Sequence, residues 1–416
     1  MESEPELPGT DTQYENLVYT PTRNAGLARL ENFVTHACRS YASNRHFDLG
    51  EGQRSNVSNL SPWIRHRLIS EEEVIRETLS RFSASTAEKF IQEIFWRAYF
   101  KGWLEHHPTV WSSYKNNLLE ILSRLDRNKD LSSRYHDAIR GETNLECFDH
   151  WVRELIDTGY LHNHARMWFA SIWIFTLRLP WELGADFFLR YLIDGDPASN
   201  TLSWRWVAGL HTKGKTYRAS RDNISKYTGG RFSPRGLSKV ADPIIEKERH
   251  SASFIPLADP LPNEEFLLLL TEEDCLVNEL LPRSPAGTVG LLVADKRSPL
   301  GVGPKVRTFS SGALNDAMAR STNKLIKITS SGEELAELVI SEACKAGVKD
   351  VVTAKPAVGS VSSVVMDAKR ELRAAGIILH CLGRDYDRFT WRHADRSFSK
   401  IKKNIPNIIQ KLGILY

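Results

Sequence analysis

The sequence predicts two domains, a mainly α-helical domain followed by a smaller α/β domain with a parallel sheet. Ten of the eleven tryptophans lie at or before Trp206. The same half has apolar residues at three- and four-residue spacing, which is typical of amphipathic helices. From about residue 262 the pattern changes to short aliphatic runs that alternate with helical stretches, as in α/β proteins. A chain of 416 residues is long enough for both domains.

Composition limits the classes of function. No apolar run approaches the roughly 18 residues that a membrane helix needs, and the acidic, proline-containing N-terminus is unlike a signal peptide. We therefore expect a cytoplasmic protein without a membrane partner. The five cysteines are far apart, and the pair His162 and His164 lacks a third ligand, so we predict no metal site.

Two helix-start signals stand out in the first domain. Ser70-Glu-Glu-Glu73 and Ser85-Thr-Ala-Glu88 both have the capping-box pattern, and each precedes a periodic apolar segment. We predict that a helix begins at each. Apolar periodicity predicts further helices at 27–41, 118–125, 147–156, 164–177 and 185–192.

The α/β domain follows a polar, proline-containing stretch. The runs "FLLLL", "VGLLVAD", "KLIKIT", "DVVTAK" and "IILHCLG" predict about five buried parallel strands, with crossover helices such as 334–346 and 361–375. The predicted organisation is a disordered tail over 1–14, a helical domain over 15–236, a linker over 237–262 and an α/β domain over 263–416.

One segment raises a nucleotide-binding alternative. "GLHTKGKT", residues 209–216, satisfies G-x-x-x-x-G-K-[ST], the pattern of a phosphate-binding loop. Such a loop needs a preceding strand and an amphipathic helix that starts at the Lys-Thr pair. The residues after Thr216 have no apolar stripe and many turn formers. A basic surface loop is therefore the preferred interpretation. An ATP-dependent enzyme would instead bind ATP tightly and lose that binding in Lys215→Ala.

Four segments carry a resemblance to a known family. Residues 161–206, "LHNHARMWFASIWIFTLRLPWELGADFFLRYLIDGDPASNTLSWRW", resemble the flavin-binding signature of the DNA photolyase/cryptochrome family. Residues 90–105, "FIQEIFWRAYFKGWLE", resemble the helix that lines its substrate cavity. "YASNRHF" at 41–47 and "SNLSPWIRHRLIS" at 58–70 resemble its two early flavin-phosphate segments. The similarity covers roughly residues 25–235 and is to photolyases of the cyclobutane pyrimidine dimer type.

The resemblance implies FAD, active in its reduced form. A reduced flavin anion needs a cation beside one edge of its ring and polar groups near N5. Arg166 and Asp194 would form a pair beside the ring, with Asp196 nearby and Asn200 facing N5; a structural salt bridge between helices is the alternative for the pair. The other cofactor-binding residues that the resemblance implies are Tyr41, Ser58, Leu60, Ser61 and Arg97.

Five further positions match the family's repair site. Trp96 and Trp206 correspond to the aromatic clamp around a flipped dimer, and Glu93 and Asn163 would hydrogen-bond the thymine edges. Asn163 and Met167 occupy positions where repair of six-four photoproducts requires His. These residues imply cyclobutane-dimer repair.

The resemblance also implies an electron-transfer chain. Trp204 and Trp181 match its first two members, whereas Asn128 lies near the place of the usual third Trp. The alternative donors in the sequence are Trp151, Trp168 and Trp173.

A basic segment follows the clamp. Residues 201–240 contain nine Lys or Arg residues against one acid, Asp222. This charge balance favours contact with a phosphate backbone, and a merely solvated loop is the alternative. The predicted DNA-binding residues are Arg45, Lys213, Lys215, Arg218 and Arg221.

These observations predict a deoxyribodipyrimidine photo-lyase, an FAD-dependent enzyme that uses light to repair cyclobutane dimers in UV-damaged DNA as a monomer. A cryptochrome-like blue-light photoreceptor without repair is the alternative; Asn200, the intact clamp and the short C-terminus favour repair. The α/β part is similar in strand order to the antenna domain with which such proteins begin. A swapped domain order, as in a circular permutation, is therefore expected, and a second, antenna chromophore of unidentified kind stays open.

Overall fold

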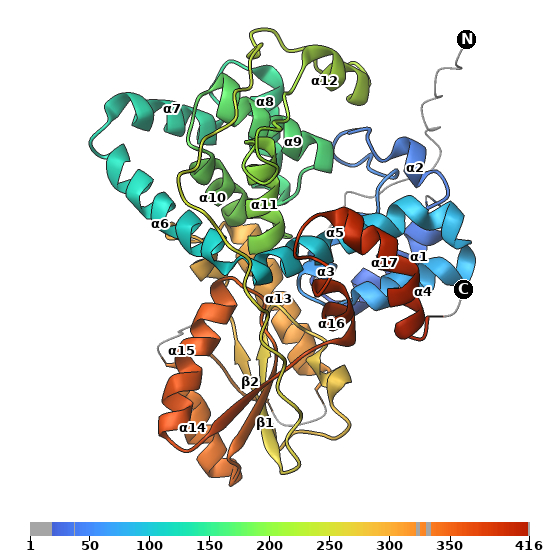
Figure 1. The fold of residues 1–416 in the computed structure, drawn as a ribbon, viewed down its shortest axis with the longest axis vertical. Coiled ribbons are helices and arrows are strands. Elements are labelled where there is room, and N and C mark those ends of the chain that lie inside the picture. The colour runs from blue at the N-terminus through green and yellow to red at the C-terminus, as the bar shows by residue number, and fades with distance from the viewer. Residues whose placement is uncertain (1–18, 37, 322–324, 330–333, 415–416) are drawn as a thin grey trace.

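The computed structural model describes residues 19–36, 38–321, 325–329 and 334–414. The predicted tail, 1–14, lies outside these residues. A helical body occupies the upper part of the molecule in Figure 1, and a parallel sheet with its covering helices lies below it. The predicted fold class, mainly α-helical followed by α/β with a parallel sheet, is confirmed.

Twelve described helices precede the first strand. They are α1 (Arg23–His36), α2 (Tyr41–Asn44), α3 (Ser61–Arg65), α4 (Glu71–Arg81), α5 (Ala84–His106), α6 (Pro108–Leu125), α7 (Lys129–Arg140), α8 (Glu146–Thr158), α9 (Asn163–Ser171), α10 (Trp181–Tyr191), α11 (Pro197–Val207) and α12 (Arg221–Tyr227). A π-helical turn, Ile172–Thr176, continues α9.

The two predicted helix starts differ in outcome. At α4 the Ser70 hydroxyl accepts from the Glu73 amide and the Glu73 carboxylate accepts from the Ser70 amide, so this capping box is confirmed. The predicted start at Ser85 is wrong, because α5 begins at Ala84. Ser83 has the extended backbone of a cap, and its hydroxyl accepts from the Thr86 amide. Ser85 therefore lies inside the first turn.

The five predicted strands form one sheet. They are β1 (Phe266–Thr271), β2 (Gly287–Leu291), β3 (Leu325–Thr329), β4 (Asp350–Ala354) and β5 (Ile378–Leu382), all parallel in the order β3-β2-β1-β4-β5. Helices α13 (Pro304–Ala319), α14 (Leu335–Ala346) and α15 (Ser360–Ala374) connect and cover them.

The central strand joins two hydrophobic cores. Leu268 and Leu270 pack into the core that contains α1, α4 and α5, whereas Leu267 and Leu269 pack with α14 and α15. Successive strand residues point to opposite faces, so a strand covered on both sides is apolar throughout. This explains the unbroken leucine run of β1.

The last two helices leave the sheet. Helices α16 (Asp385–Trp391) and α17 (Phe398–Lys411) lie beside α5, as Figure 1 shows. Gly102 on α5 allows this approach, since a Cβ at that position would be 2.8 Å from the Trp391 Cα. The predicted division of the chain at 236 and 263 stays a prediction. Part of the predicted α/β domain, helices α16 and α17, packs on the helical body.

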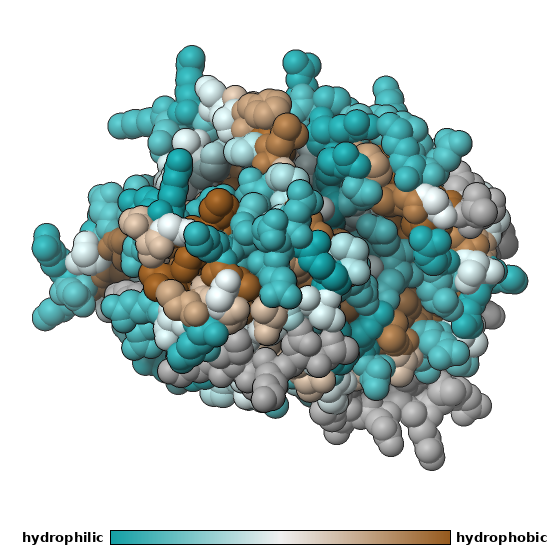
Figure 2. All heavy atoms as spheres, turned by 90° about the horizontal axis from the view of Figure 1, so that it is seen from below, coloured by the Kyte–Doolittle hydropathy of each residue, from teal (hydrophilic) through white to brown (hydrophobic). Residues whose placement is uncertain are grey.

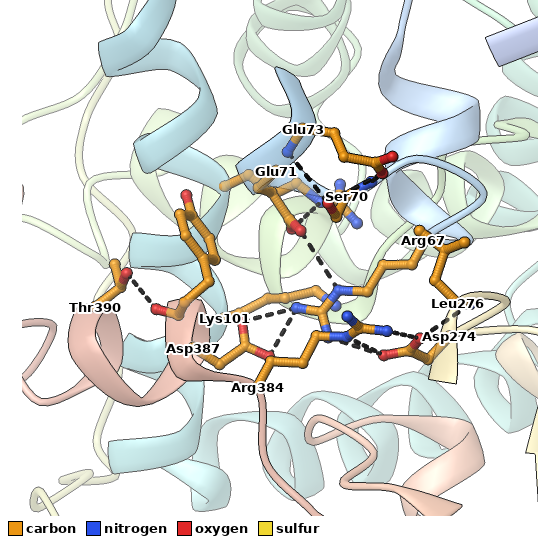
Figure 3. Close-up of polar contacts among 12 residues, drawn as sticks. Arg67, Ser70, Glu71, Glu73, Lys101, Asp274, Leu276, Arg384, Asp387 and Thr390 are labelled. Atoms are coloured by element: carbon orange, nitrogen blue, oxygen red, sulfur yellow. Dashed lines mark hydrogen bonds and ion pairs between the residues drawn. The ribbon is translucent and has the colours of Figure 1, made fainter. Parts of the chain in front are cut away.

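Charged residues join the helical body to the sheet. Figure 3 shows buried Arg67 between carboxylates from three elements, at 3.1 Å from Asp274, 2.7 Å from Asp387 and 3.4 Å from Glu71. Arg384 pairs with the same Asp274 at 2.6 Å. Each buried charge therefore has an opposite charge beside it, as burial requires.

The face seen from below is mostly polar. Figure 2 shows hydrophilic side chains over much of its coloured surface, with hydrophobic atoms in separate patches. Among the helices that the structure describes, none combines the length and apolar character needed to cross a membrane.

Candidate functional site

A cavity of about 660 Å³ lies in the helical body, bounded by α5, α9, α10, α11 and the start of α17. Its size is in the range of pockets that hold cofactors or drug-sized ligands. All five residues predicted as catalytic line it: Glu93, Trp96, Asn163, Met167 and Trp206. They lie on three helices, α5, α9 and α11, and the fold brings them to one cavity.

The predicted cofactor residues divide into two groups. The cavity is lined by Arg97, Arg166, Asp194, Asp196 and Asn200. The lining does not include Tyr41, Ser58, Leu60 or Ser61. Tyr41 packs edge-on against Phe33 and Phe90 of the core, and Ser58, Leu60 and Ser61 lie at the start of α3. Their predicted contacts with a flavin phosphate stay predictions.

Arg166 and Asp194 form the predicted pair. The Arg166 guanidinium donates to Asp194 Oδ2 at 2.8 Å and to the Leu161 carbonyl at 2.9 Å. Asp194 Oδ1 is buried without a hydrogen-bond partner. A buried unpaired carboxylate oxygen is costly, so the pair presents an unused acceptor in the cavity wall.

Asp196 has a more crowded environment. It accepts from the Ala198 and Ser199 amides and caps α11, with Arg97, Lys101 and Arg65 at 3.3, 3.6 and 3.8 Å. Burial would raise the pKa of this carboxyl, but Lys101, Arg97 and Arg65 together hold it well below its usual value. Asp196 is thus a fixed negative charge.

Asn200 is positioned by a backbone contact. Its Nδ2 donates to the Ala185 carbonyl of α10 at 2.8 Å, and the side chain is buried at the cavity wall. The neighbouring Ser199 hydroxyl is buried without a partner. Two polar groups of α11 are therefore held at the cavity by the helix on which they lie.

The cavity lining also contains an acid and several aromatic rings. Glu93, whose side chain is 41% exposed, pairs with Arg45 at 3.8 Å, and desolvation by the surrounding wall raises the pKa of its carboxyl. Trp96 stacks on Phe398 of α17 with ring centroids 3.9 Å apart and planes at 13°. Trp206 stacks on Tyr217 at 5.5 Å. Both predicted clamp rings therefore have a fixed neighbour.

The predicted electron-transfer residues are both buried. Trp204 lines the cavity, and its ring centroid lies 6.2 Å from that of Trp173. The ring centroids of Trp181 and Tyr114 are 5.6 Å apart. Asn128 caps α7 through the Leu131 amide. Trp151 and Trp168 stack on each other at 5.5 Å. Of the alternative donors, Trp173 has a described ring contact with Trp204.

The predicted DNA-binding residues lie outside the cavity lining. Lys213, Lys215, Arg218 and Arg221 are exposed on the segment that leaves α11, and Arg45 is half-buried beside Glu93. The same segment follows a helix, and the next helix starts only at Arg221. It therefore lacks the strand and the helix start that a phosphate-binding loop needs.

Sequence reasoning missed several lining residues. Lys101, which lies 3.6 Å from Asp196 but outside the lining, was also missed; it lies one turn after Arg97 on α5, so helical spacing could have indicated it. His211 and Thr212 directly follow the predicted clamp. No signal pointed to Ser397, Phe398, Ser399 and Lys402, because their proximity depends on the return of the chain to α5.

The cavity fits the ring of a flavin. Its walls combine apolar side chains with the Arg166 cation, the Asn200 amide and unpartnered oxygens on Asp194 and Ser199. Such a mixture of apolar walls and few polar groups is typical of cofactor sites.

A second, smaller space lies where the carboxyl ends of β1 and β4 meet, the position at which open α/β sheets commonly bind ligands. It measures about 10 Å³ and is lined by Arg67, Asp274, Lys355 and Asp387, among others. A space of that size holds at most about one water.

Comparison with known proteins agrees with the helical site. Residues 90–243 match the family described as the FAD binding domain of DNA photolyase. The chain is 33% identical over 195 residues to a deoxyribodipyrimidine photo-lyase of Agrobacterium fabrum, covering 46% of this chain and 39% of that protein. A second photo-lyase, from Streptomyces griseus, is 33% identical over 181 residues, 43% of this chain and 37% of that protein.

Among solved structures, a bacterial class III photolyase from Agrobacterium tumefaciens has a TM-score of 0.43 and 27% identity, covering 51% of this chain and 44% of that one. The chain spans about two fifths of the length of the curated relatives it matches.

Residues 90–243 are similar to the FAD binding domain of DNA photolyase and include most of the cavity lining. The predicted resemblance and the predicted cofactor, FAD, are therefore confirmed. The swapped domain order stays a prediction.

Proposed function

We propose that this protein is a light-dependent photolyase that repairs cyclobutane pyrimidine dimers in UV-damaged DNA. The cavity carries the proposal, because the five residues expected to contact a dimer line the same space as five of the nine expected flavin residues. The names of the related proteins support it.

Each group has a task in this proposal. When bound, reduced FAD supplies an electron on excitation by blue light. Arg166 and Asp194 hold the ring edge, and Asn200 orients a polar group towards it. Trp96 and Trp206 replace the stacking that a flipped dimer loses, and Glu93 holds a thymine edge. Desolvation raises the pKa of Glu93, and Arg45 beside it opposes that shift.

The proposal has a direct test. Protein loaded with FAD and chemically reduced is mixed with a dimer-containing oligothymidylate, and absorbance at about 260 nm is followed under blue light and in the dark. We expect recovery in light alone and roughly tenfold slower recovery for Glu93→Ala, which removes the hydrogen-bonding carboxyl group. Glu120→Ala, which removes an exposed carboxylate on α6, is the matched control. No recovery from protein that visibly holds FAD would refute the proposal.

A blue-light photoreceptor without repair activity is the second candidate. It is favoured by the stacking of Phe398 on Trp96, since one face of this clamp ring is already covered. A photoreceptor would hold FAD and respond to light in the same experiment without restoring the oligonucleotide.

A further inference from the structure

The cavity is completed by the far end of the chain. Ser397, Phe398, Ser399 and Lys402 line it from α17 and the residue before it, far along the chain from the Trp96 that they approach. Phe398 is only 8% exposed. It lies face to face with Trp96 and edge-on to Tyr99 at 5.9 Å. The orientation of the Trp96 ring therefore depends on α17.

Helix α17 is also basic on its exposed side. Residues 392–411 contain six Lys or Arg residues, all exposed, and one acid, Asp395. Lys400 pairs with Asp395 at 2.6 Å and Lys402 approaches Glu88 at 3.7 Å. Exposed pairs of this kind are weak and exchange readily for other partners. Lys402 is the cation of this group that lines the cavity.

A second basic segment reaches the same cavity. His211 and Thr212 line it, and exposed Lys213 and Lys215 follow them directly. Tyr99 joins the two segments: its hydroxyl donates to the Arg396 carbonyl at 2.8 Å and lies 3.1 Å from His211 Nε2. The cavity thus has cations on two sides and aromatic rings between them, the combination that binds a single nucleic-acid strand.

We propose that α17 is one side of a nucleic-acid interface at this cavity, in which Lys402 and Ser399 contact the phosphates that flank the entering base. Phe398 is a positioning residue that holds the Trp96 ring against this base. The inference rests on the proposed function and names the segment of the chain that contributes to DNA binding there. The proposed contacts need no movement of α17 from its position in the structure.

Two variants separate the two roles. Lys402→Ala removes one phosphate contact, so the slope of log affinity against log salt becomes less negative by about 0.7 for any single strand. The ratio of wild-type affinity to Lys402→Ala affinity then falls roughly threefold as salt rises from 50 to 200 mM. Phe398→Ala leaves this slope unchanged and lowers the ratio of affinities for dimer-containing over undamaged oligothymidylate about tenfold, because Trp96 loses its support.

The experiment is a fluorescence-anisotropy titration of labelled oligothymidylates, with and without a dimer, at four salt concentrations. Lys411→Ala is the matched control, an exposed cation on the same helix beside Phe389 and outside the cavity lining. Lys402→Arg should restore the slope. Equal slopes for wild type, Lys402→Ala and Lys411→Ala would overturn the phosphate contact, and an unchanged ratio in Phe398→Ala would overturn the positioning role.

The outcome also separates this inference from the proposed function. If the wild type shows no preference for the dimer and no light-dependent repair, the photolyase proposal fails. In that case the salt dependence of affinity for undamaged strands can still be compared between Lys402→Ala and the wild type. The two failures are therefore distinguishable.

Discussion

Asp196 shows how one residue can hold a site together. Its carboxylate accepts from two α11 amides and lies within 4 Å of Arg65, Arg97 and Lys101, which come from α3 and α5. Removing its charge would leave three buried cations with reduced compensation, which costs far more than losing a surface pair. Asp196 therefore couples the start of α11 to α3 and α5.

We expect Asp196→Asn to lower the free energy of unfolding by about 3 kcal/mol, since the amide keeps one cap acceptor but not the charge. The cations hold the pKa of Asp196 well below its usual value, so its contribution is present at neutral pH and is lost only as pH falls through that depressed pKa. Urea denaturation at pH 7 measures the loss. A variant as stable as the wild type would contradict the coupling.

Glu272 has the opposite pH dependence. Burial raises the pKa of its carboxyl to about 7 although Arg297 lies nearby. A raised native pKa means that its contribution is complete in acid and is lost as pH rises through about 7. We therefore expect Glu272→Gln to be about 2 kcal/mol more stable than the wild type at pH 8.5 and nearly equal to it at pH 5. Denaturation curves at both pH values test this, and a pH-independent difference would refute it.

Much of the candidate site could be predicted from single residues. Arg166, Asp194, Asn200 and the two clamp tryptophans all lie in the first half of the chain, and each belongs to a segment whose residues resemble the family. Phe398 could not be predicted, because only the packing of α17 on α5 brings it to Trp96.

Helix α10 and helix α11 approach closely because of a glycine. A Cβ at Gly184 would collide with the Trp204 ring and lie 2.9 Å from Trp173 Cε2. Alanine is the better helix former by about 1 kcal/mol, but overpacking two buried rings costs more.

We expect Gly184→Ala to lose about 2 kcal/mol of stability and to shift the tryptophan emission, since Trp204 must move away from α10. Thermal unfolding followed by fluorescence measures both effects. Ser123→Ala, on the exposed side of α6, should change neither. If Gly184→Ala were more stable than the wild type, α10 and α11 could move apart without a loss of stability.

Sequence patterns predicted correctly those elements that are specified by interactions between neighbouring residues. The Ser70 capping box and the aliphatic strands are specified by neighbouring residues and were predicted correctly. The start of α5 was misplaced, because Ser83 and Ser85 have the same capping chemistry and only the backbone selects between them. The sequence did not indicate that α16 and α17 return to α5, because that contact joins segments from opposite ends of the chain.

Over the whole molecule, buried charges make the sheet and the helical body one unit. Arg67 after α3 pairs with Asp274 after β1 and with Asp387 of α16. Asp274 in turn pairs with Arg384. Burial opposes the ionised form of Asp274, yet Arg384 and Arg67 lower its pKa to about 2, so these pairs persist over the whole neutral and mildly acidic range.

This arrangement predicts that both parts unfold together. Ten of the eleven tryptophans report on the helical body, whereas far-UV circular dichroism reports on all helices and strands, and we expect the two signals to change in one coincident transition. Arg67→Ala should lower the free energy of unfolding by about 3–5 kcal/mol because Asp387 and Glu71 lose their cation. Arg388→Ala removes an exposed pair with Asp385 on the same helix and should cost less than about 1 kcal/mol. Separate transitions in the wild type, or equal losses in the two variants, would mean that the sheet and the helical body are independent.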